Sequence, residues 1–389
     1  MCIRDRMLSV VRREIGRLTS RPVYLVAMVL VPVFIAFFFV GLLNPGLPLK
    51  VPAAVVDLDH SQLSRKVTRS LDAMELIDVA AKPESYHEAM QMVQEGRILG
   101  FLMIPENFER EAVAGRGPVI TYYYNLSIYV PASLMFKGFK TMAVTTSGAV
   151  VQTNLTAAGA PDYISSVALQ PITVNIHPLG NPWLNYSYYL CPSFIFGALQ
   201  LMIFIMTTFS ITQEIKYGTS PQWLGSAGGR IGTALVGKLL PQTVIWTILG
   251  LGINALMFRW NHFPMNGSMA WFNVGMLLYV IACQSFAVII SAILPNPRMA
   301  LTVNCLTGIL SFSLAAISFP TQAMYGAVAI FSDILPMRWY FLIYSDLALN
   351  GLPLYYPRMY FVYLLIFPCL AVVAAPLMKK ALKKPVYVP

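Results

Sequence analysis

Long apolar segments recur along this chain, each bounded by short polar or charged stretches. Six of them contain no Asp, Glu, Lys, Arg or His. An apolar segment of about 18 or more residues is long enough to cross the roughly 30 Å hydrocarbon core of a bilayer as a helix. The pattern predicts a membrane α-helical bundle with six transmembrane helices, at residues 23–43, 188–211, 239–258, 269–294, 300–319 and 360–377.

The segment between the first two predicted spans, residues 44–187, has a different pattern. Short apolar runs alternate there with amphipathic stretches. Alternating strands and helices indicate a compact α/β domain, here inserted between transmembrane helices 1 and 2. We expect strands at 51–58, 76–80, 98–104, 119–124 and 168–176, and helices at 61–74, 84–95, 106–114 and 129–158.

Two shorter apolar stretches, residues 324–335 and 338–349, are separated by Pro336. Each is too short to cross a bilayer. Further spans here would place Asp333 and Asp346 in lipid, which is costly. We therefore expect an external re-entrant segment within residues 320–358, ahead of the last span.

Basic residues are distributed unequally between the two sides that six spans define. One side carries twelve Lys and Arg residues against only Glu14 and Glu214 as acids. Cytoplasmic loops are rich in Lys and Arg. The N-terminal segment 7–22 and the basic tail 378–389 are therefore predicted to be cytoplasmic, and the α/β domain extracytoplasmic.

Composition agrees with a membrane protein and limits the choice of partner. Hydrophobic residues make up 57% of the 389 and charged residues 11%, whereas soluble domains contain about 25% charged residues. The net charge is +10, yet residues 44–187 contain ten bases and twelve acids. The excess charge lies beside the spans, so we expect contact with the lipid bilayer and no nucleic-acid partner. Residues 1–6 resemble a translated sequencing adapter, and the native start is expected near Met7.

Candidate catalytic chemistry is sparse. The four histidines do not have metal-ligand spacing, and neither a catalytic nor a metal site is predicted. Asp57 and Asp59 follow a predicted strand, where a turn and a cation site are both compatible with their spacing. Residues 232–238 match the start of a phosphate-binding P-loop, but Leu239 stands where Mg²⁺ binding needs Ser or Thr. Lys238 is instead expected to anchor the third span at the inner membrane interface.

The predicted spans also lack the ionisable residues that proton coupling generally needs. Transport would therefore take its energy from a partner. Neutral polar residues do occur within the spans, and they would either line a pathway or form interhelical hydrogen bonds. The pathway candidates are Gln200, Gln284 and Asn304.

Four motifs occur in a fixed order along the chain. They are a basic segment at 12–22, an Ile-Pro-Glu-Asn-Phe sequence at 104–108, a Glu…Gly-Thr…Gly-Lys pattern at 214–238, and proline and aromatic pairs within 319–351. This order resembles the type-2 permeases of ATP-binding-cassette exporters. The large insertion resembles the bacterial multidrug-type subgroup with a periplasmic domain.

The resemblance implies a cytoplasmic coupling loop, residues 213–238, which docks on a separate ATPase subunit. That partner would bind ATP and Mg, and this chain would bind no cofactor. We expect Trp223 to be an exposed aromatic that enters a groove on the partner. The implied coupling residues are Glu214, Gly218, Thr219, Gln222, Trp223, Leu224 and Lys238, and the implied interfacial N-terminal helix carries Arg12, Arg13, Glu14, Arg17 and Arg21.

The expected function is that of a non-enzymatic permease in the bacterial inner membrane. It would export hydrophobic or amphipathic substrates, drug-like or lipid-like. Six spans form half a pathway, so a homodimer or a pair with a paralogous permease is expected. The resemblance also implies a periplasmic adaptor and an outer-membrane channel. The alternative is a non-transporting membrane protein whose outer domain acts as a receptor or as a secretion or assembly factor.

Overall fold

The computed structural model describes residues 3–157, 159, 180–182, 185–315 and 323–383. The chain forms two compact units. The sheet unit is Leu47–His177, and the helical unit combines Met1–Gly46 with Pro178–Pro389. The strand expected at 168–176 lies outside the described residues.

The sheet unit contains a four-stranded mixed sheet with the order β2-β1-β3-β4. The strands β1 (Val51–Asp57), β2 (Ile77–Ala81) and β3 (Gly100–Ile104) are parallel, and β4 (Thr121–Tyr124) pairs antiparallel with β3. Parallel neighbours require crossover helices. These are α4 (Gln62–Asp72) and α5 (Tyr86–Gln94), which begin at the capping residues Ser61 and Ser85. The predicted α/β character of this segment is confirmed.

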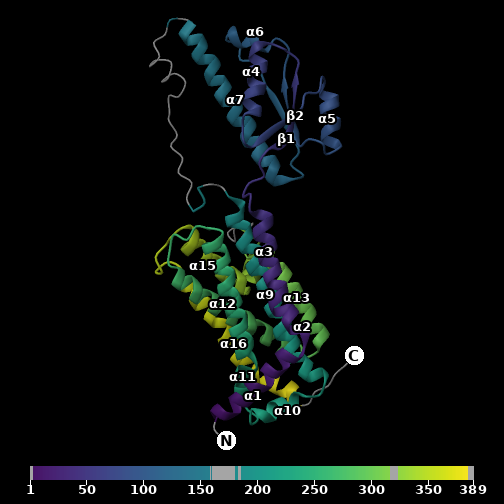
Figure 1. Ribbon diagram of the computed structural model, residues 1–389, viewed down its shortest axis with the longest axis vertical. Coiled ribbons are helices and arrows are strands. Elements are labelled where there is room, and N and C mark those ends of the chain that lie inside the picture. Colours follow the sequence, from purple (N-terminus) through teal and green to yellow (C-terminus); the bar gives the residue numbers. More distant parts are fainter. Residues whose placement is uncertain (1–2, 158, 160–179, 183–184, 316–322, 384–389) are drawn as a thin grey trace. The chain divides into compact units, whose positions relative to one another are not determined.

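Helices cover both faces of this sheet (Figure 1). Successive strand residues point to opposite faces, so Val55 packs with α4, α6 (Phe108–Val113) and α7 (Tyr129–Ala157), while Val56 packs with α5. Both valines are fully buried. The continuous apolar run in β1 therefore serves two separate cores.

The helical unit contains five described helices, some of them joined end to end, that are long and apolar enough to cross a membrane. They are α2–η1–α3 (Pro22–Leu43), α9 (Tyr186–Lys216), α11–η2 (Ile231–Trp260), α12 (Met269–Ile293) and α16 (Arg358–Lys383). The pair α14 (Gly326–Asp333) and α15–η4 (Pro336–Leu349) is bent by 81°, and it raises the number to six if it counts as one broken span. The chain is thus a helical membrane protein with five or six candidate spans.

The helix α13 (Pro297–Leu314) covers the described part of the predicted fifth span, and the predicted end at residue 319 lies outside the described residues. It begins at Asn296, whose side chain accepts a hydrogen bond from the amide of Arg298. The predicted total of six spans stays a prediction. Six results either from adding α13 to the five helices, as predicted, or from adding the bent pair as one broken span.

The helix α9 packs against α3, α12 and α13. Aromatic side chains dominate its surroundings: the rings of Tyr279 and Tyr340 stack with centroids 4.6 Å apart. Tyr279 also donates a hydrogen bond of 2.8 Å to the carbonyl oxygen of Phe196 in α9. Apolar burial and one satisfied hydroxyl group fix α12 and α15 against α9.

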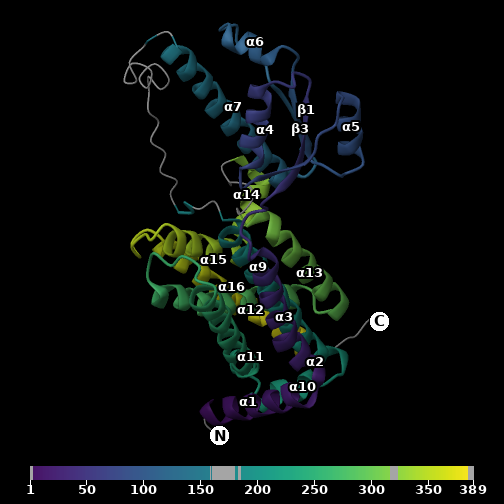
Figure 2. The same cartoon turned by 45° about the horizontal axis from the view of Figure 1, so that its top comes forward.

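The helices α1 (Ile3–Ser20) and α10 (Ser220–Ser226) lie at the same end of the helical unit (Figure 2). Pro22 begins α2 immediately after the extended residue Arg21, because proline is tolerated in the first turn of a helix. One face of α1 is buried, with Val10, Glu14 and Leu18 at a spacing of four residues. This face packs on α11.

Candidate functional site

A network of charged side chains joins α1, α9 and α11 inside the helical unit. Glu14, Glu214 and Lys238 are each at most 1% exposed. The Lys238 ammonium lies 2.8 Å from Glu14 Oε2 and 3.0 Å from Glu214 Oε1. One lysine therefore bridges carboxylates from two helices that are far apart in the sequence.

Two arginines of α1 complete the pairing of Glu214. Arg13 donates two hydrogen bonds of 2.9 Å, one to each carboxylate oxygen of Glu214. Arg17 pairs with the same carboxylate, and the hydroxyl group of Thr219 also donates to it. Such a two-pronged arginine–carboxylate contact is both strong and directional.

Gln242 connects the network to the core. Its amide donates hydrogen bonds of 2.9 Å to Glu14 Oε1 and 3.0 Å to Ser210 Oγ. We call Arg13, Glu14, Arg17, Glu214, Lys238 and Gln242 the coupling network. A buried charge is expensive unless it is paired, and removal of one partner of a buried pair costs about 3–5 kcal/mol. The network therefore holds α1, α9 and α11 as one unit.

The expected exposed position of Trp223 is wrong. Trp223 is fully buried, and Lys238 Nζ lies 4.9 Å from the centre of its ring. The neighbouring Leu224 is also buried. Helix α10 has only seven residues, and it packs against α1, α11 and α16, so its large apolar side chains become core. Ser220 adds a 2.9 Å hydrogen bond from its hydroxyl group to the carbonyl oxygen of Leu382.

Lys238 does not extend into solvent, because its ammonium group is enclosed by two carboxylates; its expected position at the membrane interface stays a prediction. The stretch 232–238, which resembles the start of a P-loop, lies in the first turns of the α11 helix. A phosphate-binding loop needs free backbone amides in a turn, which a continuous helix does not offer.

Different residues of the segment 213–238, which the resemblance implied to be a coupling loop, are exposed. Tyr217 is 58% exposed, with Arg21 and Lys216 each about 6 Å from its ring centre. Gly218 follows with a φ of +67°, a region that L side chains rarely adopt. Gln222 is exposed as well. We call Tyr217, Gly218 and Gln222 the loop surface; Tyr217 was not among the implied coupling residues.

The interfacial residues of α1 fall into two groups. Arg12 and Arg21 are exposed. Arg13 and Arg17 have side-chain exposures of only 26% and 18%, because both point to Glu214. Spacing by four residues along α1 places Arg13 and Arg17 on the same side of the helix.

The three pathway candidates are buried and hydrogen-bonded between helices. Gln200 donates a hydrogen bond of 2.7 Å to Ser311 Oγ and accepts one of 2.9 Å from the Met337 amide. Asn304 donates a hydrogen bond of 2.8 Å to Thr208 Oγ1, and Gln284 accepts one of 2.6 Å from Thr243 Oγ1. These bonds connect α9 with α13 and α15, and α11 with α12.

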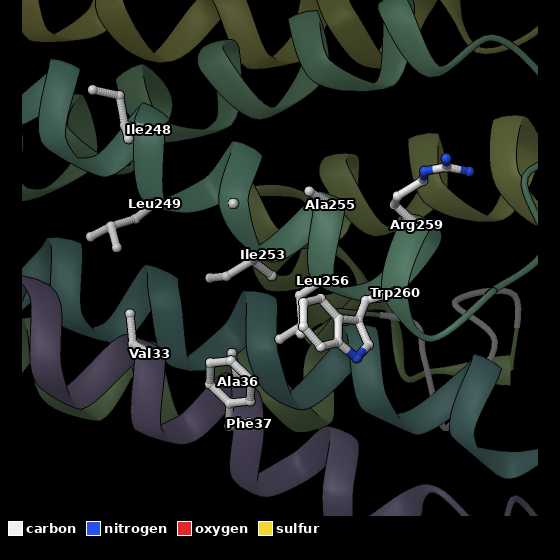
Figure 3. A pocket seen from close by; sticks show the side chains of 11 residues that line it. Val33, Ala36, Phe37, Ile248, Leu249, Ile253, Ala255, Leu256, Arg259 and Trp260 are labelled. Atoms are coloured by element: carbon white, nitrogen blue, oxygen red, sulfur yellow. The ribbon is translucent and has the colours of Figure 1, made fainter.

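An apolar groove of about 750 Å³ lies between α3 and the α11–η2 helix (Figure 3). Phe37, Ile248 and Trp260 line it and are 61%, 64% and 78% exposed. Arg259 is the one charged residue in its lining, and its side chain extends away from the α3 residues (Figure 3). Within a membrane span, such a groove is suited to an apolar chain or ring system.

Comparisons with known proteins identify the family of the chain. A family model described as "ABC-2 family transporter protein" matches residues 22–376. Two proteins named "Probable multidrug ABC transporter permease YbhR", from Escherichia coli strains K12 and O157:H7, are each 27% identical over 120 residues. These alignments cover 31% of this chain and 32% of the relatives, so the chain matches about a third of their length. Since the family model spans most of the chain, this protein belongs to the ABC-2 family of transporter proteins.

Proposed function

We propose that this chain is the permease subunit of an exporter driven by a separate ATP-binding-cassette ATPase. One observation carries the proposal: the coupling network ties the end of α9 and the start of α11 to α1. The loop surface lies between α9 and α11 in the sequence and is exposed. It is the place where a partner would push on this group of helices.

The physical consequence of the network is rigid transmission. The coupling network includes Glu214 near the end of α9 and Lys238 near the start of α11, and both belong to long apolar helices. Arg13 and Glu14 lie on α1, which leads directly into α2–η1–α3. A push on Tyr217 would therefore move three candidate spans together, a rigid-body transition of the kind that gives alternating access.

The remaining parts of the proposal concern placement and partners. Both termini and the loop surface are cytoplasmic, six spans cross the bacterial inner membrane, and the sheet unit is periplasmic. The chain works as a homodimer or with a paralogous permease, and a periplasmic adaptor and outer-membrane channel complete the route. The charge asymmetry of the loops supports this orientation.

Hydrophobic or amphipathic compounds are the proposed substrates. The groove between α3 and α11 supports this class because ten of its eleven lining residues are uncharged and apolar or glycine. The word "multidrug" in the name of the Escherichia coli relatives points to the same class.

Co-purification and transport test the proposal. The tagged full chain is co-expressed with the ABC ATPases of its own genome, and retained ATPase is measured. ATP-dependent export of an amphipathic dye is then measured in proteoliposomes. Tyr217→Ala should reduce both readouts. Tyr355→Ala is the matched control, because Tyr355 is 64% exposed and also lies beside an arginine, Arg358. A wild-type chain that retains no ATPase and exports nothing would contradict the proposal.

A further inference from the structure

The sheet unit contains a polar pocket of about 580 Å³ that the proposed function does not use. It lies at the carboxyl ends of the parallel strands β1 and β2, with α4 on one side and residues 82–84 on the other. Crevices at the carboxyl ends of parallel strands are frequent ligand sites. Its lining includes Arg65 and Arg69 of α4, together with Lys82.

None of these three bases forms an ion pair with a carboxylate within the described residues. Arg65 and Arg69 are one helical turn apart, and like charges at this spacing destabilise a helix by about 0.2–0.5 kcal/mol. A sequence that keeps such a local conflict beside a pocket indicates a function for the charges.

Both arginines are held in place by backbone acceptors. Arg65 Nη1 donates 2.7 Å to the carbonyl oxygen of His60, and Arg69 Nε donates 3.3 Å to that of Arg65. Each of these bonds uses one N–H group, and a guanidinium has five. The remaining donors are thereby oriented before any ligand arrives, which lowers the entropic cost of binding.

The turn after β1 shapes the pocket wall. His60 has a φ of +52°, which is unfavourable for a residue other than glycine. Asp57 stabilises this turn. Its Oδ1 accepts hydrogen bonds from the amides of Asp59 and His60, and its Oδ2 accepts one of 2.7 Å from Ser64 Oγ. Asp57 thus forms the turn, one of the two roles its spacing allowed. Asp57 and Glu84 are the two acids in the lining, so the three bases outnumber them there.

We propose that this pocket binds a phosphate group. Two pre-oriented guanidinium groups and one ammonium group provide the planar forks and the point charge that recognise phosphate oxygens. The group would belong either to a soluble phosphomonoester or to a lipid headgroup. The proposal is independent of ATPase coupling, because it concerns binding by the sheet unit of the full chain alone.

Binding is measured by calorimetry on the detergent-solubilised full chain. The probes are inorganic phosphate, glycerol 3-phosphate and dihexanoylphosphatidic acid, with glycerol and dihexanoylglycerol as phosphate-free controls. We expect saturable binding of at least one phosphate probe and none of the controls. Arg65→Gln and Arg69→Gln should each weaken it about tenfold or more. Lys66→Gln is the matched control, since Lys66 is an exposed base of α4 outside this pocket.

Thermal unfolding without ligand separates binding from folding. Arg69→Gln removes a like-charge repulsion, so its apo stability should stay unchanged or rise while binding falls. Stronger binding of glycerol 3-phosphate identifies a soluble phosphomonoester, and stronger binding of dihexanoylphosphatidic acid identifies a lipid headgroup. The proposal is overturned by an absence of saturable binding, or by equal losses in Lys66→Gln and Arg69→Gln.

Discussion

The ammonium group of Lys238 lies 2.8 Å from the carboxylate of Glu14, although 224 residues separate them in the sequence. Both side chains are almost completely buried. The pair joins the N-terminal helix to the start of α11, and Lys238 also reaches Glu214 at the end of α9. The two ion pairs of Lys238 therefore hold α1 against the end of α9 and the start of α11.

Removal of Lys238 should destabilise the protein strongly. Lys238→Met leaves Glu14 buried with Gln242 as its remaining partner in the described part of the chain, so a loss of about 3–5 kcal/mol is expected. The double variant Glu14→Gln/Lys238→Met should recover most of this loss, because no uncompensated carboxylate remains. Thermal or denaturant unfolding of the solubilised chain measures both effects. Additive losses in the double variant would show that the two residues do not interact.

Arg13 and Arg12 provide a matched pair for coupling. Arg13 makes the two-pronged contact with Glu214, whereas the adjacent Arg12 is exposed. Arg13→Gln should lower ATP-dependent export several-fold while the ATPase stays bound, because the loop surface is unchanged. Arg12→Gln should leave export unchanged. Proteoliposome transport and co-purification together separate transmission from docking, and equal effects of both variants would argue against the coupling network.

Replacement of Trp223 should lower stability, whereas replacement of Tyr217 should weaken ATPase binding. Trp223 is core, so Trp223→Ala should cost about 3–5 kcal/mol of unfolding free energy. Tyr217 is exposed, so Tyr217→Ala should change stability by no more than about 0.5 kcal/mol while weakening ATPase binding. Unfolding and pull-down measurements on the two variants check this. A stable Trp223→Ala variant that has lost ATPase binding would instead favour the docking role first expected for Trp223.

The groove between α3 and α11 can be filled without strain. A side chain at Gly252, which lines the groove, would meet no atom within 4 Å at its Cβ position. Gly252→Phe should therefore fold normally and lower export of bulky amphipathic dyes, with ATPase binding retained. Gly41→Phe is the control, because Gly41 is also open but does not line the groove. Unchanged export in Gly252→Phe would exclude the groove from the substrate route.

Much of the fold could be read from local patterns. The described strands and helices of the sheet unit were expected within a few residues of their observed ends, as at residues 51–58 for β1 (Val51–Asp57). Alternation of short apolar runs and amphipathic stretches is a local property, which one segment displays by itself. The apolar segments predicted membrane helices for the same reason, since bilayer thickness sets their length.

The candidate site could be predicted only in part. The motif order pointed to residues 214–238, and Glu14, Glu214 and Lys238 were all selected. Their mutual contacts were not predicted, because the three residues belong to different helices and lie far apart in the sequence. Arg65 and Arg69 were not among the candidate residues, since their pocket forms between α4 and the end of β2.

The sequence by itself determined the apolar helices and the α/β segment, because periodicity and composition are local. Only the tertiary structure decided which side of the loop faces outward. A seven-residue helix is too short for its periodicity to define a buried face, and α1, α11 and α16 cover Trp223 rather than Tyr217. Burial depends on what packs against a segment, and packing brings together residues that are distant in the chain.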